Sequence, residues 1–349
     1  MDARAAPRAA RRAVRAAGRR ARIEADRLTS RRGRADLAVF HELAAPPGGG
    51  GHQFLRALAG ELERRGLAVE WNRLSAGTPA CLFNSFNFDF ARLRRFARDG
   101  VRMVHRVDGP IGAYRGFDDG TDLRILELNR ELAEATVLQS RYSLETLVKL
   151  GLALREPVVI TNAVDPSIFH PPESRPPLAA RKVRIVASSW SENPRKGAST
   201  LEWLDRNLDP ERYELTFVGQ TARRFERVQV EGPFDSHGVA RVLREHDLYL
   251  AASRDDPCSN ALLEALACGL PVAYLESGGH PELVGAGGLP FRADEELPEV
   301  LGRLVAGYEG FRDAISAPAL ADVADRYLDV LGLGDRGLTP EGSDPTRGR

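Results

Sequence analysis

The stretch from Leu250 to Val284 constrains the fold more than any other part of the chain. The apolar run at 248–252 predicts a buried strand. An acidic loop follows, and then a helix that ends at Gly269, because Pro271 cannot continue it. A second strand begins at Pro271. This alternation of strands and helices continues on both sides of the stretch and predicts an α/β protein.

Two carboxylates lie near the predicted start of that helix. Asp256 is in the loop, and Glu264 is about one turn inside the helix, leaning back toward the loop. The first N–H groups, from the N-cap Ser259 and Asn260 onward, lack helical partners and favour a phosphate. A phosphate repels carboxylates, so we expect Asp256 and Glu264 to hold neutral sugar or ribose hydroxyls. The alternative is a solvated acidic loop before an ordinary amphipathic helix.

The same stretch resembles the donor-site signature of the retaining group 1 glycosyltransferases of GT-B fold. That signature is Glu-x7-Glu, then Ala-x-Ala-x-Gly-x-Pro-Val, then Gly-Gly-x-Pro-Glu. The matching residues are Asp256, Glu264, Ala265, Ala267, Gly269, Pro271, Val272, Gly278, Gly279, Pro281 and Glu282. The resemblance implies that Glu264 holds the nucleotide ribose and Asp256 a hydroxyl of the transferred sugar, with Gly279 and His280 also at the donor. Asp256 stands where the family usually has Glu.

Composition predicts a two-domain globular protein without a metal or membrane span. The chain has 349 residues, 43% hydrophobic and 28% charged, and zero formal net charge, so the whole carries no nucleic-acid signal. Three cysteines show no metal-binding spacing, and we expect them to be buried thiols in a reducing compartment. No apolar run approaches the roughly 20 residues of a membrane-spanning helix. These features predict a cytoplasmic location, and the resemblance implies that the protein needs no metal or other cofactor.

Residues 1–34 form a separate basic segment with twelve arginines and three acidic residues. Spacings of three and four put many of the arginines on one helical face, opposite a face of mostly alanine. An extension without a specific partner, an anionic membrane surface, a transit peptide and nucleic acid are all open readings. Many enzymes of the resembled family use lipid-linked acceptors, which favours peripheral contact with the inner face of the membrane among the specific readings.

A glycine-rich loop, 46–52, follows the strand predicted at 36–43 and precedes a helix predicted at about 53–65. Such a loop brings backbone N–H groups close to a phosphate or a sugar. Its spacing does not fit Gly-x-Gly-x-x-Gly, which argues against a nicotinamide or flavin site. The resemblance implies that Gly49 and Gly50 face the interdomain cleft at the donor; a merely flexible connection is the alternative.

The strand predicted at 102–107 carries His105 and Arg106, and Asp108 follows it. Carboxyl ends of parallel strands line the ligand crevice, so these side chains are site candidates. The resembled family often has a histidine near the reacting sugar, which implies a catalytic place for His105. A histidine that serves only the core is the alternative.

A second cationic site is predicted where the strand at 183–188 leads into a helix from about Ser199. Arg195 and Lys196 lie at this turn, where the helix dipole and charge favour a diphosphate. In the resembled family a Lys-Gly pair binds the donor diphosphate, usually with an Arg five positions earlier. That position is Ser191 here, so Arg195 is the nearby arginine that remains.

The chain divides into five predicted segments: a basic extension at 1–34, an N-terminal domain at 35–170, a proline-rich linker at 171–181, a C-terminal domain at 182–331 and a disordered tail at 332–349. The segment 162–171 resembles the family's exit from the first domain, and the family often returns a C-terminal helix to that domain. Helices are expected at 295–305 and 311–331.

We therefore predict a GT-B glycosyltransferase with two Rossmann-like domains across a cleft. The resemblance implies that it transfers a sugar from a nucleotide sugar to a saccharide, lipid-linked or envelope glycan, with retention of configuration and without a required metal. The donor would be held mainly by the C-terminal domain and the acceptor mainly by the N-terminal domain. The alternatives are a catalytically silent sugar-nucleotide-binding or scaffold protein, and a nucleic-acid-binding protein that acts through residues 1–34.

Overall fold

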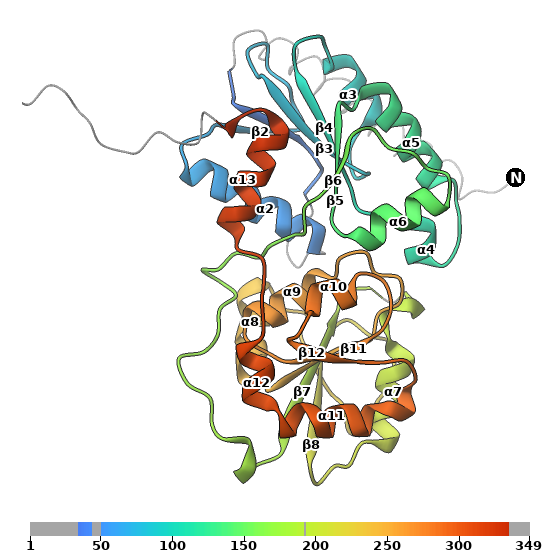
Figure 1. The fold of residues 1–349 in the computed structure, drawn as a ribbon, viewed down its shortest axis with the longest axis vertical. Helices are drawn as coiled ribbons and strands as arrows, with labels where there is room; N and C mark the ends of the chain where they lie inside the picture. The colour runs from blue at the N-terminus through green and yellow to red at the C-terminus, as the bar shows by residue number, and fades with distance from the viewer. Residues whose placement is uncertain (1–33, 44–49, 192, 335–349) are drawn as a thin grey trace, which may run out of the picture.

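The computed structural model describes residues 34–43, 50–191 and 193–334. It contains two α/β domains, one above the other in Figure 1, each built around a parallel sheet. The basic segment before residue 34, Gly49 of the glycine-rich loop and the tail beyond residue 334 lie outside the described residues.

The N-terminal sheet, as far as the structure describes it, has six parallel strands. In spatial order they are β2 (Val69–Trp71), β1 (Leu37–Phe40), β3 (Ala80–Asn84), β4 (Arg102–Val107), β5 (Ala135–Leu138) and β6 (Pro157–Val159). The central strands are short runs buried on both faces, as parallel sheets between helices require.

The C-terminal sheet also has six parallel strands within the described residues. In spatial order they are β12 (Gly288–Phe291), β11 (Val272–Leu275), β10 (Leu248–Ala251), β7 (Val183–Ser189), β8 (Tyr213–Gly219) and β9 (Gln229–Glu231). Read from β9, this is the Rossmann strand order 3-2-1-4-5-6, while the N-terminal sheet has the order 2-1-3-4-5-6.

Each order fixes where a ligand crevice forms. In a doubly wound sheet the crevice opens outside the carboxyl ends of the two strands at which the winding direction reverses. Those strands are β1 and β3 in the N-terminal sheet and β7 and β10 in the C-terminal sheet. His41, Asn84, Lys196 and Asp256, described below, lie at or beyond the carboxyl ends of these four strands.

Helices cover both faces of the N-terminal sheet. Helices α2 and α13 pack on one face, and α3 and α5 pack on the other, with α4 and α6 beside α5. Their bounds are α2 (Gly50–Arg64), α3 (Phe90–Phe96), α4 (Ile111–Arg115), α5 (Thr121–Leu132), α6 (Arg141–Lys149) and α13 (Leu320–Leu331). Helix α2 begins three residues before the predicted position, and α4 was not predicted.

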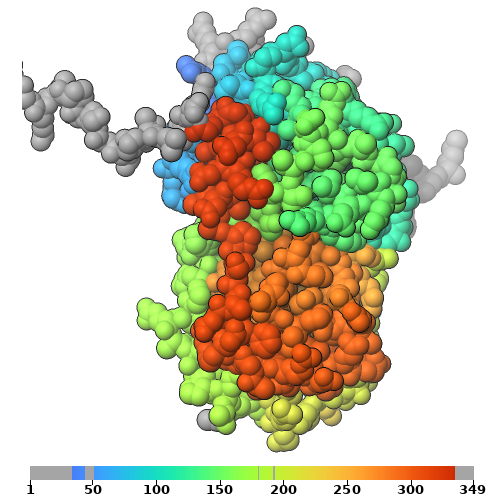
Figure 2. All heavy atoms as spheres, viewed as in Figure 1, coloured from blue at the N-terminus to red at the C-terminus, as the bar shows by residue number. Residues whose placement is uncertain are grey.

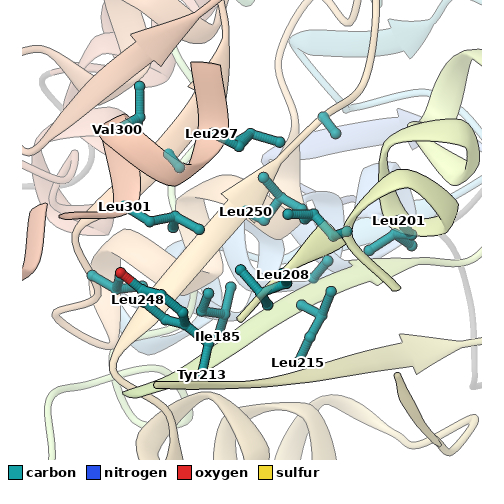
Figure 3. Packing of buried hydrophobic residues seen from close by; sticks show 14 of the residues in the cluster. Ile185, Leu201, Leu208, Tyr213, Leu215, Leu248, Leu250, Leu297, Val300 and Leu301 are labelled. Atoms are coloured by element: carbon teal, nitrogen blue, oxygen red, sulfur yellow. The ribbon is translucent and has the colours of Figure 1, made fainter. Parts of the chain in front are cut away.

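The C-terminal sheet is covered in the same way. Helices α7 and α11 bury one face, where leucines of both helices meet the strands (Figure 3), and α8, α9 and α10 bury the other. Their bounds are α7 (Ala198–Asn207), α8 (Ser236–Glu245), α9 (Asn260–Ala267), α10 (His280–Val284) and α11 (Leu297–Ala306). All three cysteines are buried and unbridged, as predicted.

The last helix belongs to the core of the other domain. Figures 1 and 2 show the red segment leaving the lower domain and lying beside α2 on the upper one. Helix α13 contributes Tyr327, Leu328 and Leu331 to the N-terminal core, so the predicted unit 182–331 contains a segment that packs with residues 35–170. The expected return of a C-terminal helix to the first domain is confirmed.

Two predictions at this end of the chain are wrong. The expected helix 311–331 is two helices, α12 (Tyr308–Asp313) and α13, because Pro318 cannot donate a helical hydrogen bond and restricts the residue before it. The disordered tail does not begin at Gly332, because Leu333 is 1% exposed and packs in the N-terminal core.

Polar contacts join the two domains across the cleft. Glu282 accepts hydrogen bonds from Arg141 N and Tyr142 N, 3.0 and 3.1 Å away, at the start of α6. Asn162 Nδ2 donates to Asn260 Oδ1 at 3.0 Å. The two switch points therefore face one another at close range.

Candidate functional site

A cavity of about 380 Å³ opens between the domains at the carboxyl ends of β7, β8 and β10. Most of its wall comes from the C-terminal domain, and the N-terminal domain adds Gly51, Gln53 and Tyr114. The residues that line it are Gly51, Gln53, Tyr114, Ala187, Ser188, Ser189, Trp190, Ser191, Lys196, Gly197, Leu201, Phe217, Gln220, Phe234, Ser236, Val239, Tyr249, Leu250, Ala251, Ala252, Ser253, Asp256, Cys258, Ser259, Asn260, Ala261 and Glu264. It contains five residues predicted from sequence: Lys196, Asp256, Ser259, Asn260 and Glu264.

The β10–α9 connection positions the carboxylates as predicted. Ser259 is the N-cap of α9, and its hydroxyl oxygen accepts a hydrogen bond from Leu262 N at 3.4 Å. Glu264, one turn further, faces the same cavity as the loop that contains Asp256. The early N–H groups of α9 point out of the helix end at this cavity.

Glu264 is buried without a hydrogen-bond partner among the described residues. It is 7% exposed, and burial alone raises the pKa of its carboxyl group to about 8. A buried polar group without a partner is costly, and such groups mark places where a ligand completes the hydrogen bonding. Hydroxyl donors from a ligand would stabilise the carboxylate here.

Lys196 reaches the cavity from the turn after β7. Gly197 follows it in the left-handed region (φ 84°), and a Cβ there would lie 2.5 Å from the Ala252 side chain. Only glycine lets this turn approach the end of β10 so closely. Lys196 Nζ lies 2.8 Å from Asp256 Oδ2 and 4.6 Å from the centre of the Tyr114 ring.

The Lys196–Asp256 pair is charged on both sides. Burial lowers the pKa of Lys196, but Asp256 and Tyr114 raise it by more, so the pKa lies above its usual value. Burial raises the pKa of Asp256, but Lys196 and His280 lower it by more, so the pKa lies below its usual value. The sequence assigned the two groups separate ligands, whereas the structure pairs them.

Both carboxylates are buried, although the acidic loop could also have been solvated. Asp256 is 4% exposed and Glu264 is 7% exposed. The reason is that α2 and α9 pack against each other and the Gly278–Gly279 turn closes over the Asp256 loop. Substitutions at either position therefore affect folding as well as ligand binding.

Arg195 points away from this cavity and toward the domain interface. Its guanidinium pairs with Asp255, whose other oxygen accepts from the Tyr142 hydroxyl of the N-terminal domain at 3.1 Å. Its Nε lies 2.6 Å from where a Cβ on Gly116 would be. Arg195, which was assigned to a diphosphate from the sequence, therefore forms an ion pair at the domain interface instead.

Gly279 and His280 support the Asp256 loop from behind. Gly279 N donates to Asp256 O at 2.9 Å, so the Gly279 amide is already used. His280 is fully buried, with its ring nitrogens 3.0 Å from Leu275 O and from Ser253 Oγ. Neither residue lines the cavity, where the sequence analysis had placed both at the donor: Gly279 holds the backbone of Asp256, and His280 contacts the Ser253 hydroxyl beside it.

His105 lies in the core of the N-terminal domain and lines neither cavity at the cleft. Side chains alternate along a strand, so His105 faces α5 while Arg106 faces α2. His105 is fully buried, stacks on Phe83 with ring centres 4.3 Å apart, and lies 3.2 Å from Asn129 Nδ2. Burial lowers its pKa to about 3. His105 is therefore placed as a histidine of the core, which was the alternative to a catalytic place.

Gly50 is the first residue of α2, and its neighbour Gly51 is the glycine of this loop region that lines the cavity. The predicted phosphate loop therefore enters the helix earlier than expected.

A second cavity of about 270 Å³ adjoins the first on the N-terminal side. Its lining residues are His41, Gly51, His52, Asn84, Phe86, Asn87, Asp108, Ile111, Tyr114, Arg115, Gln139, Asp256, Pro257, Cys258 and Asn260. Of these, Asp108, Asp256 and Asn260 were singled out from the sequence, whereas His41, Asn84 and Gln139 were not. Their signal was position: His41 directly follows β1 and Asn84 ends β3, the two strands of the switch point.

Hydrogen bonds tie this second wall together. His41 Nε2 lies 2.8 Å from His52 Nδ1, and Asn84 Nδ2 lies 3.3 Å from His41 Nδ1 and 3.1 Å from Asp108 Oδ2. Burial and the neighbouring His52 lower the pKa of His41 to about 4, and burial and Arg56 lower the pKa of His52. Both imidazoles are therefore neutral near pH 7.

Among the residues that the structure describes, no group of three or more His, Cys, Asp or Glu side chains is placed to hold a metal ion. No helix in this part of the chain is both long enough and apolar enough to span a bilayer.

Comparison with known proteins adds to this geometry. Residues 186–307 match the profile of the family described as glycosyl transferases group 1. The chain matches no curated protein sequence at a significant level.

Solved structures share the fold at low identity. HepE from Anabaena, in complex with UDP and glucose, is 16% identical with a TM-score of 0.60, covering 86% of this chain and 97% of that one. Sucrose-phosphate synthase from Thermosynechococcus elongatus is 15% identical with a TM-score of 0.62, covering 86% and 96%. A glycosyltransferase from Rickettsia africae is 12% identical with a TM-score of 0.64, covering 85% and 98%. The chain therefore has the GT-B fold, and its C-terminal domain matches the group 1 glycosyltransferase family.

Proposed function

We propose that this chain is a glycosyltransferase that moves a sugar from a nucleotide sugar to a hydroxyl group of an acceptor. One observation carries the proposal: the buried carboxylate of Glu264 has no hydrogen-bond partner among the described residues and faces a cavity that also contains Lys196 and the start of α9. A nucleoside diphosphate sugar would supply hydroxyl donors for Glu264, and negative charge for the helix end and for Lys196, which contacts Asp256 in the structure.

The proposed reaction replaces one bond at C1 of the donor sugar by another. The acceptor hydroxyl oxygen forms a bond to C1 of the sugar, and the bond from C1 to the diphosphate oxygen breaks, its electron pair leaving with the diphosphate. The hydroxyl proton goes to the diphosphate or to solvent. Lys196 and the α9 N–H groups stabilise the charge that develops on the departing diphosphate.

Lys196 must exchange partners for this role. In the structure its ammonium contacts Asp256, and a diphosphate oxygen would share or replace that contact. Asp256 would then be available to a hydroxyl of the transferred sugar. This assignment, like that of Glu264 to the ribose, rests on the resemblance together with the shared cavity.

Retention of configuration and independence from metal are also proposed from the resemblance. The acceptor would be a saccharide, a lipid-linked sugar or an envelope glycan. The protein would act at the cytoplasmic side and contact the membrane peripherally through residues 1–34. Proteins of the same fold support a nucleotide ligand: HepE is seen with UDP and glucose, and starch synthase IV from Arabidopsis thaliana with ADP and acarbose.

Binding and turnover together test the proposal. UDP, GDP and ADP are titrated against the chain by calorimetry, and their glucose conjugates are assayed for release of the nucleoside diphosphate. We expect one nucleotide to bind and its sugar conjugate to be consumed. Glu264→Gln should weaken that nucleotide about tenfold or more, the loss of a charged hydrogen bond of about 1.5–3 kcal/mol. Binding without turnover on any acceptor would support the catalytically silent alternative, and no binding at all would reject both.

A further inference from the structure

We infer that Asn162 is a positioning residue for the proposed reaction: it holds the side-chain amide of Asn260 so that the N–H group, and not the carbonyl oxygen, is available to a ligand in the cleft. This inference rests on the proposed function, because it assigns a role beside the departing diphosphate. Asn162 is fully buried, lies shortly after β6 and lines neither cavity of the cleft. It can therefore act on a ligand only through a neighbour.

The orientation of the Asn162 amide is set by Arg106. A guanidinium has N–H donors and no acceptor. Arg106 is fully buried, and its Nη2 donates to Asn162 Oδ1 at 3.0 Å. Because an arginine can only donate, the oxygen of the Asn162 amide must face it, since the reversed amide would bring N–H groups against N–H groups. The buried asparagine is therefore fixed in one of its two amide orientations.

Asn162 passes this orientation across the domain interface. Its Nδ2 donates to Asn260 Oδ1 at 3.0 Å. Since an amide nitrogen also only donates, Asn260 must turn its oxygen toward Asn162, and its own Nδ2 is then the other branch of the amide. No residue in the described part of the chain accepts a hydrogen bond from Asn260 Nδ2. Two successive hydrogen bonds thus leave an N–H donor at the end of the Arg106–Asn162–Asn260 relay.

Asn260 stands where the direction of a hydrogen bond matters to the proposed reaction. It is the first residue of α9, it is half-buried, and it lines both cavities. The departing diphosphate is proposed to bind at this end of α9, and its ionised oxygens only accept hydrogen bonds. An N–H group fixed in advance stabilises them, whereas a carbonyl oxygen in the same place would repel them. The relay therefore favours the diphosphate by excluding the wrong orientation of Asn260.

A double-mutant cycle in the full chain tests the inference. UDP, GDP or ADP, whichever the wild type binds, is titrated by calorimetry against the wild type, Asn162→Ala, Asn260→Ala and the double variant. We expect Asn260→Ala to weaken binding about tenfold and Asn162→Ala about threefold or more. On the Asn260→Ala background, Asn162→Ala should change affinity by less than about twofold, because Asn162 acts only through Asn260. A merely structural role would weaken both backgrounds equally.

Asn162→Asp is a second variant that keeps an acceptor for Arg106, in case Asn162→Ala does not fold. Arg106 is also held by Asp108 and by Asn84 Oδ1, 2.7 Å from its Nη1. The new carboxylate cannot donate, so the Asn260 amide should turn and present its oxygen to the ligand. We expect about tenfold weaker binding in the wild-type background and less than about threefold in Asn260→Ala, where only the added charge acts.

Two results overturn the inference while leaving the proposed function in place. One is wild-type affinity for the nucleotide in a folded Asn162 variant. The other is an equal loss of affinity with and without the Asn260 side chain. A wild-type chain that binds none of the three nucleotides overturns the proposed function, and the positioning role of Asn162 with it.

Discussion

The two sheets each place polar side chains at their switch point, but the side chains differ in kind. In the C-terminal domain, β7 and β10 lead to a charged pair, Lys196 and Asp256, beside a buried carboxylate with no described partner. In the N-terminal domain, β1 and β3 lead to His41 and Asn84, which belong to a hydrogen-bonded network. The first arrangement therefore places an ion pair and that carboxylate at the cleft, and the second places imidazole and amide groups around one carboxylate there.

The difference also shows in how each site is encoded. The residues of the C-terminal site lie mainly in two short stretches, because a strand, its turn and the next helix end supply the lysine, the helix N–H groups and the carboxylates together. The N-terminal site draws on the ends of separate strands. A sequence pattern therefore marks one half of the cleft and leaves the other half unmarked.

The largest effect is expected at the Lys196–Asp256 pair of the C-terminal domain. Lys196→Ala should lower sugar transfer about 10²–10³-fold, the loss of a group that stabilises developing charge. It should also lower the free energy of unfolding by about 3–5 kcal/mol, because it leaves the buried Asp256 without its counter-charge. Transfer rates and denaturant unfolding measure the two effects.

A double variant is the control for this pair. Lys196→Met combined with Asp256→Asn removes both charges, so it should recover most of the lost stability and none of the transfer. If Lys196→Ala unfolds like the wild type, the ion pair is not formed in solution and the contrast between the two switch points is wrong.

The second prediction concerns the helix that crosses between the halves. Leu328→Ala should cost about 2–5 kcal/mol of unfolding free energy, because Leu328 is 2% exposed in the N-terminal core. Leu301→Ala is the matched control, since Leu301 is fully buried in the C-terminal core. Hydrogen exchange should show Leu328→Ala loosening the strands of the N-terminal sheet and Leu301→Ala those of the C-terminal sheet. Loosening of the same strands by both would show that the domains unfold as one unit.

The third prediction uses pH to probe Glu264. Its folded pKa of about 8 lies above the unfolded value of 4.5, so between these values the unfolded chain binds fewer protons. Stability from this group is therefore complete below pH 4.5 and decreases as pH rises to about 8, by at most about 1.4 kcal/mol per pH unit. Glu264→Gln does not titrate, so its stability relative to the wild type should increase over this window in the absence of nucleotide. A constant difference would mean that Glu264 is not buried in the free protein.

The smallest expected effect is at the contact between the halves. Glu282→Gln weakens the charged cap on the start of α6, a contribution of about 0.3–1 kcal/mol that salt screens. We expect KM for the nucleotide sugar to rise about threefold or less at low salt and to match the wild type at high salt. Glu299→Gln, an exposed glutamate of the same domain, is the control. Equal shifts in KM for both variants would mean that the contact of Glu282 with α6 does not affect binding of the nucleotide sugar.

The sequence by itself determined the α/β class, the C-terminal wall of the first cavity and the N-cap at Ser259, because these depend on neighbours within one turn or one βαβ unit. Tertiary structure alone decided which side chains share a cavity. Strand alternation turned His105 into the core and left Asp108 at the cleft, and domain packing drew Arg195 to Asp255 and Lys196 to Asp256. Sequence cannot rank such contacts, because a cation satisfies either a ligand or a nearby carboxylate, and the distance between segments that lie far apart in the chain decides which.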